Sequence, residues 1–183
     1  TKFINVLKLK LNMVEIEKPF MKVKKLKKNA TLPSKRSEDA GYDLYAVIEE
    51  ENLILMPGEI KLMPTGISIQ IPENYVFYIA ERGSTGSKGI AKRAGIIDSG
   101  FRGEIFVALN NTSNKPVIFY KDESKLEEFL KQKNLSVQNV TLYPLNKAIA
   151  QGLLLYCPHV EIEEVTELGE SIRGSGALGS SKK

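Results

Sequence analysis

Apolar and polar residues alternate through the first half of the chain in short runs that predict β-strands. Four runs are clearest, and Pro or Gly residues separate them: 53–56, 60–62, 67–71 and 75–79. Alternation with a period of two places one face of a strand in a core, and Pro and Gly favour turns. Strands of this length and spacing are typical of an all-β sandwich, barrel or jelly roll.

The second half of the chain continues this pattern and adds one helix. Strand-like runs follow at 105–109, 117–120, 140–143 and 148–156. Between the second and third of these runs, Leu126, Phe129 and Leu130 recur at helical spacing. We therefore predict a short helix, inserted around residues 122–133, in an otherwise all-β domain.

The use of cysteine and histidine and the hydropathy narrow the class of protein. The 183 residues include one Cys and one His, Cys157 and His159, which excludes a disulfide framework and the usual zinc sites. No apolar run is long enough to span a bilayer, and the start of the chain lacks the pattern of a secretory signal. We expect a soluble, cytoplasmic protein with no membrane partner.

Charge is distributed unevenly along the chain. Residues 1–36 carry eleven Lys or Arg against two Glu, whereas residues 37–183 carry fifteen against twenty Asp or Glu. The basic segment 22–28 contains no aromatic residue on which a nucleic acid base could stack, and lysines often protect the edge of a sheet. We interpret it as a lysine-bordered strand and expect no specific nucleic acid partner.

The segment 95–104 places one acid, Asp98, in a glycine-rich turn between strand-like residues. At the mouth of a hairpin, a carboxylate held by two strands can act as a general base, and the glycines let a substrate approach the backbone. Asp is also a common turn former, because its side chain bonds to its own backbone. The segment alone leaves both interpretations open.

Three further segments contain residues suited to a binding site. Asp43 lies between apolar residues of a short predicted strand, so its carboxylate needs a partner if that face is buried. Segment 81–89 combines Arg82 and Lys88 with glycines and hydroxyls, which suits a phosphate group, and Arg173 begins a similar cluster in the tail. Segment 81–89 does not have the order of a Walker A motif. Alternatively, segment 81–89 is a solvated turn and the tail cluster is a flexible terminus.

These segments resemble the five motifs of the trimeric dUTP diphosphatase (dUTPase) family, in the family's order: 40–46, 82–88, 95–104, 147–153 and 173–181. The resemblance implies a β jelly-roll or β-sandwich subunit of a homotrimer, whose three active sites are each shared between subunits. It also implies a β domain at 21–170 and a flexible Gly/Ser-rich tail at 171–183 that closes the active site. Residues 1–20 are expected to be an N-terminal extension, in part of upstream origin.

The resemblance implies roles for individual residues. Asp98 matches the catalytic acid that orients the attacking water, and Asp43 matches a supporting acid. Phe101 stands where the family usually has Tyr, whose ring excludes a 2′-hydroxyl. The expected substrate contacts come from the phosphate motifs, the turn and the tail: Arg82, Gly83, Ser84, Gly95, Ile97, Phe101, Gln151, Arg173, Leu178, Gly179 and Ser180. Mg²⁺ is the implied cofactor, held mainly by the triphosphate of the substrate rather than by protein ligands.

Three residues depart from the family pattern. Gly83 stands where many members have a phosphate-binding Ser, Leu178 replaces a Phe that stacks on uracil, and Lys92 stands where some members place an Asn beside the base. We expect Leu178 to hold the base less firmly than Phe, because it has no aromatic ring. Uracil would still be read by the backbone of the turn segment.

The implied reaction is the hydrolysis of dUTP to dUMP and diphosphate, with water attacking the α-phosphate. This reaction keeps uracil out of DNA and supplies dUMP for thymidylate synthesis. A dCTP deaminase of the same fold would need a Glu ten residues after the acid of the turn, and position 108 is Ala. A dUTPase-like protein that acts mainly by binding a partner protein, through segment 122–139, is the alternative from another class.

Overall fold

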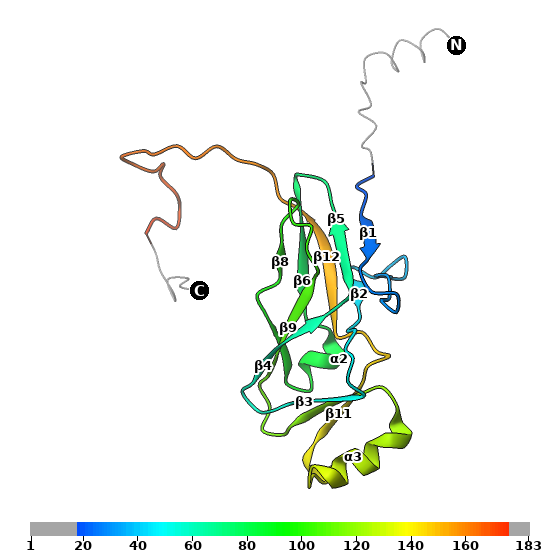
Figure 1. Cartoon of the computed structure of the whole chain (residues 1–183). Helices are drawn as coiled ribbons and strands as arrows, with labels where there is room; N and C mark the ends of the chain where they lie inside the picture. Colours follow the sequence, from blue (N-terminus) through cyan, green and yellow to red (C-terminus); the bar gives the residue numbers. More distant parts are fainter. Residues whose placement is uncertain (1–17, 176–183) are drawn as a thin grey trace, which may run out of the picture.

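The computed structural model describes residues 18–175, which form mostly β-structure with a few short helices (Figure 1). The strands are β1 (Lys22–Lys25), β2 (Tyr42–Leu44), β3 (Asn52–Leu55), β4 (Ile60–Pro64), β5 (Ile67–Gln70), β6 (Tyr75–Ala80), β7 (Ile90–Arg93), β8 (Ile96–Ile97), β9 (Phe106–Asn111), β10 (Val117–Tyr120), β11 (Thr141–Pro144) and β12 (Ala150–Tyr156). The helices are α2 (Gly83–Gly86) and α3 (Leu126–Gln132), with 3₁₀ turns η1 (Glu123–Lys125) and η2 (Val137–Asn139). The prediction of a mostly β domain with one short inserted helix is confirmed.

The strands pair into four small sheets. Their orders are β2-β12-β6-β8, β4-β9-β7, β11-β10-β3 and β1-β5. The longest ladder joins β12 to β6, with residues 151–156 antiparallel to residues 75–80. Neighbouring strands in these sheets are often far apart in the sequence, so the sheets hold the chain together through long-range pairing.

The four sheets share one hydrophobic core. In β6, Phe77 and Ile79 are buried, while the residues between and beside them are partly exposed, as expected for a strand with a single inward face. Buried residues of all four sheets join the same cluster: Leu44, Leu55, Met63, Ile67, Ile69, Ile90, Val107, Leu109, Val117, Phe119, Tyr143 and Ala150. The ring of Phe77 lies against Gly152 of β12, where a Cβ atom would lie 1.9 Å from the ring, so this position requires glycine.

Strand β1 lies at an edge, paired only with β5. Its lysines are exposed, while Val23 is partly buried against the core. The interpretation of the basic segment as a lysine-bordered edge strand is therefore confirmed for Lys22–Lys25.

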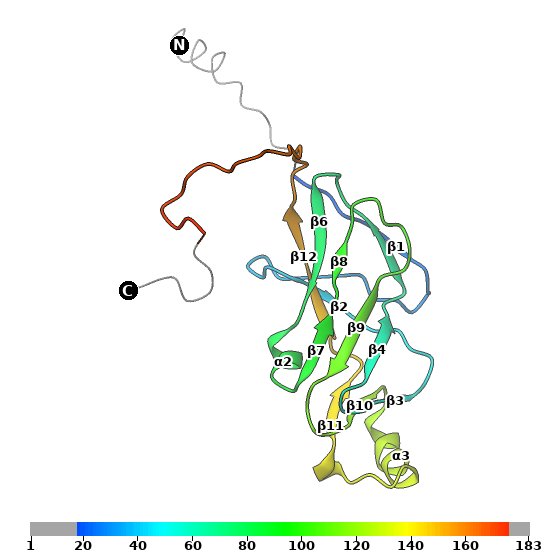
Figure 2. The same ribbon diagram turned by 90° about the vertical axis from the view of Figure 1, so that its left-hand side faces the viewer.

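The inserted helix α3 covers one face of the β11-β10-β3 sheet (Figures 1 and 2). Successive residues of a strand point to opposite faces, and in β10 Phe119 packs into the main core while Ile118 packs under the helix. Leu126, Leu130 and Val140 complete this second buried cluster. The insertion is thus anchored by its apolar residues.

Beyond β12 the described chain continues as an exposed segment, residues 157–175, that leaves the body of the domain (Figure 1). No helix within the described part of the chain is long and apolar enough to cross a membrane. Residues 1–17 and 176–183 lie outside the described structure, and with them most of the predicted extension and the predicted contacts Leu178, Gly179 and Ser180.

Candidate active site

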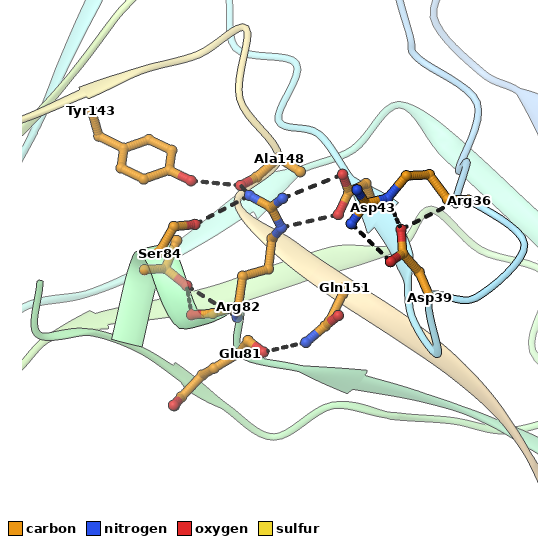
Figure 3. A network of polar contacts seen from close by, with 10 residues as sticks. Arg36, Asp39, Asp43, Glu81, Arg82, Ser84, Tyr143, Ala148 and Gln151 are labelled. Carbon is orange, nitrogen blue, oxygen red and sulfur yellow. Dashed lines mark hydrogen bonds and ion pairs between the residues drawn. The ribbon is translucent and has the colours of Figure 1, made fainter. Parts of the chain in front are cut away.

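Arg82 lies at the centre of a polar network that joins three elements (Figure 3). Its Nε lies 2.9 Å from Oδ1 of Asp43 in β2, and its Nη2 lies 3.4 Å from Oδ2 of the same carboxylate. Its Nη1 donates to the Ala148 carbonyl at 3.2 Å, and the same carbonyl accepts the hydroxyl of the buried Tyr143 at 2.6 Å. The partner that Asp43 was predicted to need is therefore the guanidinium of Arg82, which this network fixes in direction.

Helix α2 begins directly after Arg82. The Arg82 guanidinium donates to the Ser84 hydroxyl at 3.2 Å, and the buried Thr85 hydroxyl donates to the Arg82 carbonyl at 2.9 Å. Gly83 has no atom within 4 Å of the position that a Cβ would occupy. The predicted phosphate motif is thus a rigid turn that presents one guanidinium, one hydroxyl and an open glycine.

Gln151 in β12 lies beside this turn. Its Nε2 donates to the Glu81 carbonyl at 2.7 Å. A Cβ on Gly41 would lie 2.4 Å from Oε1 of Gln151, so the first motif needs glycine at this position to leave room for the amide. Residues from three predicted motifs therefore meet at one place, although they lie far apart in the sequence.

One wall of a cavity of about 690 Å³ is formed by Gly41, Asp43, Arg82, Ser84 and Gln151. Its other wall is the loop before β2, with Lys35, Arg36 and Asp39, which the sequence analysis did not identify. Arg36 Nε lies 2.9 Å from Asp39 Oδ2, and the hydrogen bond and charge of this pair raise the pKa of Arg36 and lower the pKa of Asp39. In the sequence, the only feature that could have indicated a binding role for this loop was its pair of adjacent basic residues, because the loop has no hydrophobic periodicity.

The Asp98 turn lies elsewhere. The amide of Phe101 donates to the Asp98 carbonyl at 3.1 Å, which closes the turn, and Arg102 Nη1 donates to the carbonyls of Ser99 and Phe101 at 2.6 and 2.8 Å. The Asp98 carboxylate is exposed and forms no ion pair with any described residue. It is therefore available to a water molecule or a ligand. The contacts of Arg102, which brace the turn, were not predicted from the sequence.

The prediction that the strands on either side of Asp98 pair with each other as a hairpin is wrong. Strand β8 before the turn pairs with β6, whereas β9 after it pairs with β4 and β7 in another sheet. Two neighbouring apolar runs predict two strands, but they do not determine which strand each of them pairs with.

The pairing also separates Asp98 from the phosphate-type cavity. Ile97 lies opposite Phe77 in an antiparallel pair, so the chain at Asp98 continues toward the start of β6. Arg82 lies beyond the other end of β6, five residues after Phe77. Asp98 is thus level with Val76, six residues before Arg82, so at about 3.3 Å per residue the backbones of Asp98 and Arg82 are roughly 20 Å apart along the strand. Neither Asp98 nor Phe101 lines the cavity of about 690 Å³.

The remaining predicted residues lie near the turn or in the tail. Gly95 and Ile97 line a smaller cavity of about 140 Å³ beside β9. Arg173 is exposed in the segment after β12, and it has an interaction beyond the contacts described above. Among residues 18–175, no three His, Cys, Asp or Glu side chains are grouped as a metal site.

The chain is similar to proteins of one family. A family model described as dUTPase matches residues 27–125. The curated deoxyuridine 5′-triphosphate nucleotidohydrolase of Clostridium tetani is 34% identical over 167 residues, which cover 89% of this chain and 97% of that protein. The protein of the same name from Gloeothece citriformis is 35% identical over 164 residues, which cover 87% and 94%.

A solved structure extends this similarity to the fold. The dUTPase of Staphylococcus bacteriophage 80alpha with dUPNHPP is 24% identical, covers 90% of this chain and 99% of its own, and has a TM-score of 0.68. The phage protein thus shares the fold of this chain.

Proposed function

The chain belongs to the dUTPase family, and from this we propose that the cavity beside Arg82 binds the phosphates of dUTP while Asp98 acts on the attacking water. The activity itself follows from the family and its curated relatives: the protein is a dUTP nucleotidohydrolase. Water and dUTP are converted to dUMP and diphosphate, with cleavage between the α- and β-phosphates.

One observation carries the assignment of the phosphate site. Arg82 is held by Asp43 and the Ala148 carbonyl, so its guanidinium is oriented before any ligand arrives. A preorganised guanidinium beside a hydroxyl and an amide stabilises charge on a phosphate without a cost of reorganisation. Ser84 and Gln151 supply that hydroxyl and amide in the same cavity.

Asp98 is the proposed acid for the attacking water. Its exposed carboxylate can accept the proton of a water molecule, while the closed turn limits its motion. Phe101, three residues later, is 42% exposed and is free to pack against the deoxyribose. A ring in that position would leave no room for a 2′-hydroxyl and so would favour dUTP over UTP.

The donor set fits Mg²⁺ bound mainly through the triphosphate. The two carboxylates at the cavity, Asp43 and Asp39, are paired with Arg82 and Arg36. Mg²⁺ usually binds one or two carboxylates at most, together with substrate phosphates and water. When bound, the ion would neutralise charge on the phosphates, and the residues of this chain would position them.

The separation of Asp98 from Arg82 supports a site completed between copies of the chain. Two residues whose backbones lie roughly 20 Å apart along β6 cannot both place their side chains against the α-phosphate of one dUTP molecule. We propose a homotrimer of jelly-roll subunits in which Asp98 of one subunit faces the Arg82 cavity of another. The tail from residue 171 onward would close this site.

Two alternatives have less support. Leu126 and Leu130 of the 122–139 segment are buried against the sheet, and only Val137 among its apolar residues is well exposed, at 53%. The segment therefore has a packing role before any partner is invoked. Ala108 lies in β9 opposite Leu62, where a deaminase would require an acid.

The free and exposed Cys157 suits a reducing compartment, and the proposed location is the cytoplasm.

The substitution Asp98→Asn tests the assignment of the acid. Asn retains the shape of the side chain and removes its basic oxygen, so kcat for dUTP should fall by roughly two to four orders of magnitude. Binding of a non-hydrolysable dUTP analogue, measured by calorimetry, should persist. Near-normal turnover would remove Asp98 from the mechanism.

A further inference from the structure

The backbone immediately before β8 has an unusual conformation. Ala94 has a φ of 55°, and Gly95 follows with a φ of 122°. The first value lies in the left-handed region, which is unfavourable for alanine because of its Cβ. At Gly95 a Cβ would lie 2.7 Å from the Ile79 carbonyl oxygen, so no larger residue fits there. This turn needs contacts that hold it in place.

Lys92 supplies those contacts. Its Nζ donates to the Ala94 carbonyl at 2.7 Å and to the Tyr78 hydroxyl at 3.1 Å. The ammonium also lies 4.3 Å from the centroid of the Tyr78 ring. The backbone amide of Lys92 donates to Glu81 Oε1 at 2.9 Å. The Lys92 side chain therefore connects the turn to β6. The Lys92 backbone is in turn bonded to Glu81, the residue that follows β6.

The turn sets the position of the next residues. The Gly95 carbonyl accepts the amide of Ile79 at 2.8 Å, and Ile96 and Ile97 then pair with β6. The family resemblance, on which the proposed function rests, implies that the backbone around Gly95 and Ile97 reads the edge of uracil. Hydrogen bonds to a base weaken steeply when donor and acceptor are displaced, so the accuracy of this turn limits base recognition.

We propose that Lys92 is a positioning residue for base recognition, because its ammonium holds the Ala94 carbonyl against Tyr78 and so fixes the backbone of residues 95–97. This inference rests on the proposed function. Lys92 does not line the cavity beside Gly95 and Ile97, so it acts through the backbone and not by touching the ligand. Lys92 is also one of the three residues at which the sequence departs from the family pattern.

The test compares two substitutions of Lys92 with a matched control. Lys92→Met retains an apolar stem and removes every donor, whereas Lys92→Arg retains donors and charge. Lys115→Met is the control, because Lys115 Nζ also donates to a backbone carbonyl, that of Gln138 at 2.9 Å, and Lys115 lines neither cavity. All three proteins are assayed with Mg²⁺ for dUTP turnover and for binding of dUMP.

Lys92→Met should raise KM for dUTP and Kd for dUMP by the same factor, about ten-fold, as expected for the loss of a charged hydrogen bond. The value of kcat should stay within about two-fold, because Asp98 and the phosphate cavity are untouched. Lys92→Arg should recover most of the loss, and Lys115→Met should match the wild type. A wild-type KM in Lys92→Met, or a fall in kcat alone, would overturn the proposal.

Hydrogen exchange separates failure of this inference from failure of the proposed function. In Lys92→Met the amide of Ile79, which bonds to the Gly95 carbonyl, should exchange faster, while amides of β9 should not change. This readout needs no substrate, so it applies even to a protein that does not hydrolyse dUTP. Unchanged exchange at Ile79 contradicts the positioning role. If Lys92→Met does not fold, Tyr78→Phe removes the hydroxyl partner and should shift KM and exchange in the same direction.

Discussion

Gly83 opens helix α2 at the edge of the phosphate cavity and contributes no side chain to it. A Cβ there would meet nothing within 4 Å, so a serine fits without displacing a neighbour. Gly83→Ser should therefore lower KM for dUTP by roughly two- to ten-fold, which is the worth of one hydrogen bond to a phosphate oxygen. Steady-state kinetics measure the change.

The control for this prediction is Gly83→Ala, which adds the same Cβ without the hydroxyl. It should leave KM unchanged while improving the intrinsic helix propensity of the position. Equal effects of Ser and Ala would show that the gain comes from the backbone and not from a phosphate contact.

At the level of single residues, the sequence could show that a side chain requires an interaction partner, but it could not show which residue that partner is. Asp43 was expected to require a partner because it lies between apolar residues, and the structure supplies Arg82. The pair of Arg36 and Asp39 was not predicted, because an exposed loop has no hydrophobic period from which contacts can be inferred. The roles of Asp98 and of the tail stay predictions.

At the level of secondary-structure elements, helix α3 has a packing role that can be separated from catalysis. Leu130 is 7% exposed and belongs to the cluster between α3 and β10. Leu130→Ala should lower the free energy of unfolding by about 2–4 kcal/mol, through lost burial and the cavity left behind. Chemical denaturation measures this change.

The kinetics of the same variant supply the control. Because α3 covers the β11-β10-β3 sheet and contributes no residue to either cavity beside the proposed site, kcat and KM for dUTP should stay within about two-fold of wild type. A large loss of activity in a folded Leu130→Ala protein would connect the insertion to catalysis.

The elements were predicted from the sequence more reliably than their pairing. Period-two alternation identifies the inward face of β6, and the residues at that face are indeed buried. The partner of β8 is β6 and not β9, and this follows from contacts that are distant in the sequence and carry no local signature. Local patterns therefore predicted the strands of the site, but not the distance between Asp98 and Arg82.

At the level of the whole molecule, three apolar side chains of β4 and β9 are exposed on the outer side of the β4-β9-β7 sheet. Ile60 is 56% exposed, Leu62 is 63% exposed and Phe106 is 44% exposed. Leu62 and Phe106 also line the smaller cavity beside Gly95 and Ile97. Exposed apolar residues of this kind, next to the cavity beside Gly95 and Ile97, would be buried if another copy of the chain packed there and completed the site.

The proposal that dUTP is hydrolysed at sites completed between subunits can be tested by mixing an Asp98→Asn protein with an Arg82→Ala protein. The two proteins are unfolded together and refolded at equal concentrations. Sedimentation first confirms that each variant alone forms a trimer. The release of diphosphate from dUTP with Mg²⁺ is then measured for each variant and for the mixture.

In a cyclic trimer, every mixed assembly contains one site with Asp98 from one subunit and Arg82 from another, both intact. Random mixing then restores about a quarter of the wild-type activity, while each variant alone is nearly inactive. No recovery in a mixture that sediments as trimers would contradict the account, because it would mean that Asp98 and Arg82 serve the same site from within one chain.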